Sequence, residues 1–139
     1  GSLVIAFTRM LRSMSLARST LPHLMLCSLM RIIVQPDILF VSRDREEIIT
    51  EKNIEGPPDL IIEIVSDSSR EREIDRTIKR KLYAKYGVSE YWIVEPDERS
   101  IEVLSLRKEG CETIMGVKGD NLLISPVFAG LEIPLREIF

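Results

Sequence analysis

The chain has 139 residues, which is room for one hydrophobic core and excludes a protein of several large domains. Hydrophobic residues make up 45% and charged residues 29%, as in an ordinary globular protein, and no apolar run is long enough to span a membrane. The net charge of -3 excludes attraction of nucleic acid by the chain as a whole, so contact with DNA would need a local basic surface. The two cysteines, Cys27 and Cys111, suggest neither a disulfide framework nor a zinc site, which favours a reducing, cytoplasmic setting.

The first part of the chain differs in composition from the rest. Residues 1–36 contain no Asp or Glu, and they hold four of the five methionines. The same stretch carries a set of arginines: Arg9, Arg12, Arg18 and Arg31. We therefore treat residues 1–31 as an anomalous N-terminal segment and residues 32–139 as the domain. An acid-free segment rich in serine and arginine is also typical of an organelle transit peptide.

The domain opens with two predicted strands. An apolar run broken by Gln35 and Pro36 resumes over residues 38–41, which predicts a strand entered through a proline. A polar stretch that closes with Gly56-Pro57-Pro58 then predicts a short helical or irregular connection and a turn. The sequence DLIIEIVS, residues 59–66, is apolar and β-branched almost throughout, so it predicts a strand covered on both faces.

A helix and further strands are predicted next. The polar residues 66–69 offer N-caps for a helix that runs to about Tyr86 and stops at Gly87. Three apolar residues recur every four positions and form its expected buried stripe: Ile74, Ile78 and Leu82. The sequence EYWIVEP, residues 90–96, predicts another buried strand, and the remainder predicts a hairpin followed by a covering tail. This order of elements indicates a mixed α/β fold.

Two carboxylates stand out in the predicted strands. Asp37 precedes the first strand, and Glu63 interrupts the apolar core of the second, on the same face as Asp59. Mg²⁺ is usually held by one or two carboxylates together with water or phosphate oxygens, so Asp37 and Glu63 could hold such a cation if the sheet brings them together. In the structural alternative, Asp37 follows a proline at a strand entry, Glu63 pairs with an arginine and Asp59 belongs to a turn.

The predicted helix carries further candidates. Asp75, Lys79 and Tyr83 lie on a flank beside the buried stripe, so Lys79 borders the side that faces the sheet. An ammonium group there could orient a water nucleophile and stabilise charge on a phosphoryl group, but Asp75 and Lys79 also have the spacing of an ordinary helical ion pair. Three arginines are expected to project towards solvent, where they could meet a DNA backbone: Arg72, Arg76 and Arg80.

An ordered set of segments carries a family resemblance. The set comprises VQPDILFVS, GPPDLIIEIVSDSS, the spacing of Asp75, Lys79 and Tyr83, GVSEYWIVEP and SPVFAGLEIPLREIF. Together these segments resemble the Uma-two family of restriction endonucleases, within the PD-(D/E)XK nuclease superfamily. The resemblance implies a restriction endonuclease-like fold, a mixed sheet flanked by helices, that hydrolyses phosphodiester bonds of DNA with Mg²⁺ or Mn²⁺.

The resemblance also implies roles for single residues. Asp37 looks like the first motif aspartate, and Glu63 looks like the acid of (D/E)XK. Val65 stands where that tripeptide has its lysine, and the following helix supplies Lys79 instead. Ile64 could offer its backbone carbonyl to the metal. The expected catalytic residues are therefore Asp37, Glu63 and Lys79, with Asp59, Asp75 and Tyr83 as candidates for a supporting role.

The resemblance does not extend to the segment before residue 32. Family members usually carry an acid-bearing helix and an edge strand there, and neither pattern is visible. Codons exist for residues 16–31 that would give a typical family strand when read in another frame. We hypothesise that part of this segment is an out-of-frame translation, with a divergent first helix and strand as the alternative. Resequencing the gene and finding an intact frame would exclude the frameshift.

The leading hypothesis from sequence is a metal-dependent DNA endonuclease. His23 is the sole histidine and no Ser or Cys has a recognisable base partner, which argues against histidine-dependent nucleophilic catalysis. Neither a GxGxxG motif nor a Walker-type loop supports nucleotide-cofactor chemistry. Two alternatives stay open: a catalytically inactive module of the same fold that binds DNA or protein, and an accessory subunit that forms a homodimer.

Overall fold

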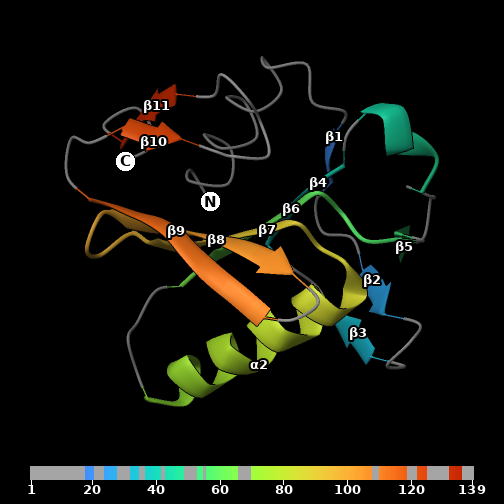
Figure 1. The fold of residues 1–139 in the computed structure, drawn as a ribbon, viewed down its shortest axis with the longest axis horizontal. Coiled ribbons are helices and arrows are strands. Elements are labelled where there is room, and N and C mark those ends of the chain that lie inside the picture. Colours follow the sequence, from blue (N-terminus) through green and yellow to red (C-terminus); the bar gives the residue numbers. More distant parts are fainter. Residues whose placement is uncertain are drawn as a thin grey trace.

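A computed structural model describes the main strands and the long helix of the chain. The described residues are 18–20, 24–27, 32–34, 37–41, 43–48, 53–54, 56–65, 70–107, 110–118, 122–124 and 132–135. Within these ranges the chain forms a six-stranded sheet, a three-stranded sheet, a two-stranded sheet, one α-helix and one 3₁₀ helix (Figure 1).

The six-stranded sheet has the order β1-β4-β6-β7-β8-β9. Its strands are β1 (Arg18–Thr20), β4 (Ile38–Val41), β6 (Leu60–Ile64), β7 (Glu90–Glu95), β8 (Ser100–Arg107) and β9 (Gly110–Lys118). Only the central pair, β6 and β7, runs parallel, and each other neighbouring pair in this sheet is antiparallel. The sheet is therefore mixed, and residues 18–20 of the anomalous segment contribute an edge strand to it.

The remaining elements are short apart from one helix. The three-stranded sheet has the order β3-β2-β5, from β2 (Leu24–Cys27), β3 (Ile32–Val34) and β5 (Asn53–Ile54). The strands β10 (Leu122–Ile124) and β11 (Glu132–Pro134) form an antiparallel pair. The 3₁₀ helix η1 (Arg43–Ile48) lies in the predicted connection between β4 and β6, and α2 (Arg70–Tyr86) joins β6 to β7. Among the described residues, no helix is both long and apolar enough to cross a membrane.

The sequence predicts the central elements closely. The apolar runs around Ile61 and Ile93 become β6 and β7, which are buried along almost their whole length as expected of parallel strands with both faces covered. Helix α2 ends at Tyr86, and Gly87 adopts a φ of +104°, a left-handed conformation that favours glycine. The amides of Gly87 and Val88 both donate to the Tyr83 carbonyl, at 3.1 and 3.0 Å, which closes the helix.

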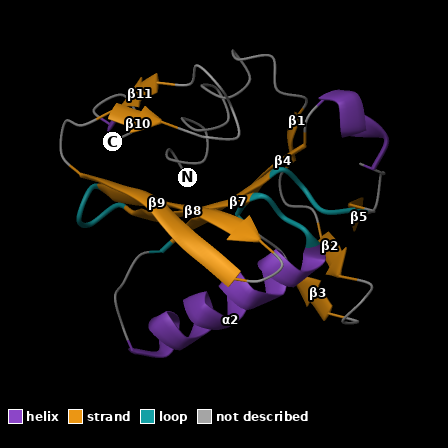
Figure 2. Cartoon of the chain, in the orientation of Figure 1, coloured by secondary structure: helices purple, strands orange, loops and turns teal. Residues whose placement is uncertain are grey.

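The sheet separates two layers. Figures 1 and 2 show α2 on one face and β10 with β11 on the other. The core under α2 includes Leu39, Ile61, Tyr83, Tyr91 and Leu104, all nearly or fully inaccessible to solvent. Because side chains alternate along a strand, the residues between these, such as Phe40 and Trp92, face the other layer and are also buried. A polar group that lies directly under α2, such as the carboxylate of Glu63, is therefore shielded from water by the helix.

The expected buried stripe of α2 is confirmed at Leu82 and wrong at Ile78, and the side chain of Ile74 lies outside the described residues. Ile78 is 59% exposed, whereas Leu82, Tyr83 and Ala84 are buried. The sheet-facing side of the helix includes Lys79 and Tyr83, whose polar ends reach Glu63 in β6. A long polar side chain can cover apolar surface with its stem, so counting only apolar residues places the stripe about one residue out of phase.

Two matched truncations test this orientation of the helix. Leu82→Ala should lower the free energy of unfolding by about 2–5 kcal/mol, because it removes buried contacts and leaves a cavity. Ile78→Ala, one turn earlier on the exposed side, should change it by no more than about 0.5 kcal/mol. Urea denaturation of both variants measures the difference. Equal losses in the two variants would contradict the orientation of α2.

Candidate active site

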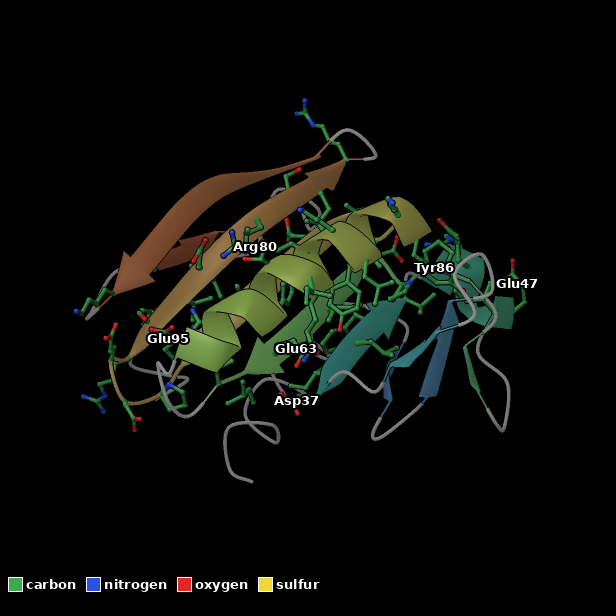
Figure 3. All side chains as sticks on the ribbon, turned by 90° about the horizontal axis from the view of Figure 1, so that it is seen from below. Asp37, Glu47, Glu63, Arg80, Tyr86 and Glu95 are labelled. Atoms are coloured by element: carbon green, nitrogen blue, oxygen red, sulfur yellow. The ribbon has the colours of Figure 1, made fainter. Side chains whose placement is uncertain are left out.

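Asp37 directly precedes β4, and Glu63 lies in the neighbouring strand β6. The antiparallel register of β4 and β6 pairs Ile38 with Ile62, and continuing this register by one residue beyond β4 brings Asp37 opposite Glu63. Directly opposed residues in such a pair have Cβ atoms about 4.5–5.5 Å apart, and opposed like charges destabilise a sheet. Figure 3 shows the two side chains together at the ends of these strands, below α2. This juxtaposition is unfavourable unless a cation or hydrogen-bond donors compensate it.

Glu63 receives two donors from α2. The Tyr83 hydroxyl donates to Oε1 of Glu63 at 3.0 Å, and the Lys79 ammonium donates to Oε2 at 3.4 Å. Lys79 and Tyr83 are four residues apart and therefore lie on the same side of the helix. Glu63 itself is only 7% exposed. The helix thus carries both groups that make a carboxylate tolerable in the core.

The pKa of Glu63 is raised above its ordinary value. Burial is the largest cause, because a charged carboxylate loses its hydration under the helix. The Lys79 ammonium lowers the pKa and the Asp37 carboxylate raises it, while the hydrogen bonds from Tyr83 and Lys79 lower it further. The net direction shows that Lys79 and Tyr83 do not fully compensate for burial and for the facing acid. The carboxylate would gain from one more positive charge.

Asp37 is exposed, and the backbone holds one of its oxygens. The amide of Ile64 donates to Oδ2 of Asp37 at 2.7 Å. In a strand the N–H and C=O of one residue point to the same side, and the next residue points to the other. Val65 follows this rule, since its amide donates to Val94 of β7 at 2.9 Å. The Ile64 carbonyl therefore points away from β7 and towards the β4 side of β6. Because β4 begins only at Ile38, this carbonyl lies beside Asp37 and not beside a paired strand residue.

These groups fit a small hard cation. Within the described ranges, no cluster of three or more His, Cys, Asp or Glu side chains could hold a metal. The available oxygens come from two carboxylates, Asp37 and Glu63, and from the Ile64 carbonyl. Mg²⁺ needs only one or two carboxylates, because it keeps several waters or takes phosphate oxygens. The donor set suits Mg²⁺ or Mn²⁺ better than zinc, which prefers nitrogen and sulfur ligands.

Asp59 lies at the opposite end of β6 from Ile64. Its carboxylate pairs with Arg45 of η1 at 3.0 Å, and Arg45 also donates to the Pro57 carbonyl at 2.6 Å. These contacts tie the connection between β4 and β6 to the start of β6. The geometry places Asp59 in a structural ion pair and not beside Glu63. The side chains of Asp75 and Arg72, two further predicted site residues, lie outside the described residues.

Arg76 and Arg80 lie between α2 and the sheet, and the expectation that they project to solvent is wrong. Arg76 pairs with Glu95 at 2.9 Å, and Arg80 lies 3.9 Å from Glu102. Their side chains are 13% and 29% exposed. The two acids also line a cavity of about 330 Å³ with Ile93, Ser100, Ile101, Gly116 and Lys118. A DNA contact through either arginine would first have to break its ion pair.

A second buried acid, Glu90, was not singled out from the sequence. It is fully buried in β7, and the Trp92 indole donates to its Oε2 at 2.7 Å. Glu90 alternates with Tyr91, which faces α2, so Glu90 points to the opposite face from Glu63. Glu90 adjoins an apolar run in EYWIV, as Glu63 interrupts one in IIEIV. This pattern of an acid beside apolar residues predicts that the acid is buried, but it does not predict which face of the sheet the acid occupies.

Comparison with known proteins supports a nuclease-type fold. The model of the Uma2 family, described as "Putative restriction endonuclease", matches residues 2–136. The matched range includes the segment before residue 32, to which the sequence motifs do not extend. A solved structure, a putative nuclease belonging to DUF820 from Anabaena variabilis ATCC 29413, superposes with a TM-score of 0.73. It is 21% identical, and the alignment covers 99% of this chain and 78% of that one. No curated protein matches the chain.

Proposed function

The chain belongs to the Uma2 family, and we propose that it is a cytoplasmic endonuclease that hydrolyses DNA phosphodiester bonds with Mg²⁺ or Mn²⁺. One observation carries the proposal: Asp37 and Glu63 face each other at the ends of two strands, and Lys79 donates to Glu63. Two opposed carboxylates destabilise a sheet when nothing compensates their charge. The same two carboxylates, with a lysine beside them, suit the active site of a metal-assisted phosphodiester hydrolase.

Three groups of the chain would hold the cation. Each carboxylate has one oxygen held by a short hydrogen bond, Oε1 of Glu63 by Tyr83 and Oδ2 of Asp37 by Ile64, whereas Oε2 of Glu63 has only the longer contact with the Lys79 ammonium. The second oxygen of each carboxylate and the Ile64 carbonyl would then supply the protein ligands. When bound, the cation would neutralise charge on a phosphoryl oxygen and make a water molecule more acidic. Burial of Glu63 under α2 excludes water from one side of this site.

Lys79 supplies the remaining positive charge. Its ammonium lies 3.4 Å from Oε2 of Glu63, a distance consistent with a weak charge-assisted contact, and its side chain is 29% exposed. The group can therefore reach solvent or a substrate without leaving the site. A compact ammonium with three donors can orient an attacking water and stabilise charge that develops on the phosphoryl group. We assign this role to Lys79.

Contact with the DNA backbone would come from basic side chains of α2. Arg76 and Arg80 are held in ion pairs with strand carboxylates, whereas Lys81 and Lys85 are exposed on the same helix. Phosphate contacts of this kind contribute affinity but no sequence readout. We expect such binding to weaken as salt is raised, because each contact releases counterions.

The test is cleavage of supercoiled plasmid by the purified chain. We expect nicked and linear products with Mg²⁺ or Mn²⁺ and none with EDTA. Calorimetric titration of the same protein with each cation, without DNA, reports whether the site binds metal. Binding of plasmid without cleavage, at metal concentrations that saturate the site, would reject the endonuclease and favour the inactive DNA-binding module.

A further inference from the structure

The two oxygens of Glu63 have different partners. Oε1 accepts the Tyr83 hydroxyl at 3.0 Å, and Oε2 lies 3.4 Å from the Lys79 ammonium. The contact with Tyr83 is a short hydrogen bond inside the core, and the contact with Lys79 is a long one to a partly exposed side chain. The carboxylate is therefore held at Oε1 and is more readily available at Oε2.

The side chain of Tyr83 is fixed by packing in the core. It is fully buried, and its ring packs edge-to-face on Tyr91, with centroids 5.3 Å apart and an interplanar angle of 84°. Such aromatic pairs stabilise their geometry beyond simple burial. Since the ring cannot shift without disturbing the core, the position of its hydroxyl relative to Oε1 is set by packing.

The second carboxylate is held in the same way. The Ile64 amide donates to Oδ2 of Asp37 at 2.7 Å, so each acid has one oxygen held by a short hydrogen bond and the other more readily available to a cation. A carboxylate that offers one oxygen is a monodentate ligand. Mg²⁺ takes near-octahedral geometry with distances of about 2.0–2.1 Å, whereas Ca²⁺ takes 6 to 8 oxygens at roughly 2.3–2.6 Å and often binds carboxylates through both oxygens.

We propose that Tyr83 is a positioning residue that keeps Glu63 a one-oxygen ligand and so makes the site prefer Mg²⁺ or Mn²⁺ over Ca²⁺. This inference rests on the proposed metal site. In this arrangement Tyr83 would contact neither the cation nor the DNA. It acts through Oε1 of Glu63, and loss of its hydroxyl would allow both oxygens to turn towards a larger cation.

The test compares Tyr83→Phe with Tyr91→Phe in the full chain. Both variants remove one buried phenol hydroxyl from the same ring pair, but only the Tyr83 hydroxyl bonds Glu63. Calorimetric titrations with Mg²⁺, Mn²⁺ and Ca²⁺ give the affinities without DNA. We expect Tyr83→Phe to lower the ratio of Mg²⁺ to Ca²⁺ affinity by about 10-fold, the lower end of what loss of an outer partner of a metal ligand causes. Tyr91→Phe should leave the ratio unchanged.

Infrared spectra of the wild-type protein give a second readout. The carboxylate stretches of Glu63, identified by subtracting the spectrum of Glu63→Gln, should show the wide splitting of a monodentate ligand with Mg²⁺. A narrow, bidentate splitting with Mg²⁺ would overturn the inference, as would equal losses of Mg²⁺ and Ca²⁺ affinity in Tyr83→Phe. With either outcome the proposal that the chain is a metal-dependent endonuclease would still stand. If the wild-type chain binds none of the three cations, the proposed function fails as well.

Discussion

Replacement of Glu63 by glutamine should slow metal-dependent DNA cleavage by about 1,000-fold, because a metal ligand contributes several kcal/mol to the transition state and each 1.4 kcal/mol is tenfold in rate. Glutamine keeps the size of the side chain and can still accept the Tyr83 hydroxyl. It removes the negative charge that faces Asp37 across β4 and β6. The loss of rate would therefore report the charge of the ligand and not a collapse of the core.

Initial rates of plasmid nicking at several concentrations of Mg²⁺ measure this effect. If the variant lost only affinity for the cation, excess Mg²⁺ would restore the rate; we expect no full recovery, since the neutral amide also changes the charge at the reacting phosphate. Asp59→Asn is the matched control, because it makes the same kind of change just before the same strand, at a residue that pairs with Arg45. Cleavage by Glu63→Gln within a factor of two of the wild-type rate would exclude Glu63 as a ligand.

The same variant should change how stability depends on pH. The pKa of Glu63 is raised in the folded chain, so the folded state binds this proton more tightly than the unfolded state. Without metal, the contribution of Glu63 to the free energy of unfolding should therefore fall as pH rises from the ordinary carboxyl value through the raised one. Glu63→Gln removes that contribution. Denaturation in EDTA across this pH window should show wild type losing stability relative to the variant, and saturating Mg²⁺ should reverse the loss.

The strands and the identity of the two acids could be predicted from sequence, but their alignment could not. Long apolar runs around Glu63 and beyond Pro36 signal buried strands, and an acid inside such a run signals a charge with a partner. Whether Asp37 faces Glu63 depends on the register of β4 and β6, and a shift of one residue would turn the two acids to opposite faces. That register emerges from the packing of the whole sheet and not from either strand alone.

The rotation of α2 was also beyond the sequence, for a different reason. Apolar periodicity assigns the buried side to Ile74, Ile78 and Leu82, whereas the folded helix leaves Ile78 exposed. The side that packs on the sheet includes Lys79 and Arg76, whose charged ends pair with Glu63 and Glu95. Pattern rules count such residues as solvent-facing. In this helix the ion pairs lie on the same side as the buried residues Leu82, Tyr83 and Ala84, and the acids that complete them are in place only once the strands have paired.

Replacement of Lys79 by methionine should reduce cleavage by about 100- to 1,000-fold, the range for loss of one group that stabilises developing charge. Methionine keeps an unbranched apolar side chain over the sheet and removes the ammonium. This ammonium lies at Oε2 of Glu63, the oxygen that we assign to the cation. Lys79 and the cation therefore compete in the ground state, and the variant should bind Mg²⁺ at least as tightly as wild type at a pH where Glu63 is ionised.

Measuring both Mg²⁺ affinity and cleavage rate in Lys79→Met distinguishes two possible roles of Lys79. If its ammonium only neutralises Glu63, the cation would replace it on binding and the rate at saturating Mg²⁺ would be unchanged. If it orients water or stabilises the phosphoryl group, the rate stays low whatever the metal concentration.

Lys81→Met removes an exposed lysine two residues further along α2 and controls for the loss of one positive charge near DNA. Because Lys79 lowers the pKa of Glu63, Lys79→Met should also move the onset of Mg²⁺ binding to higher pH, a shift that Lys81→Met should not reproduce.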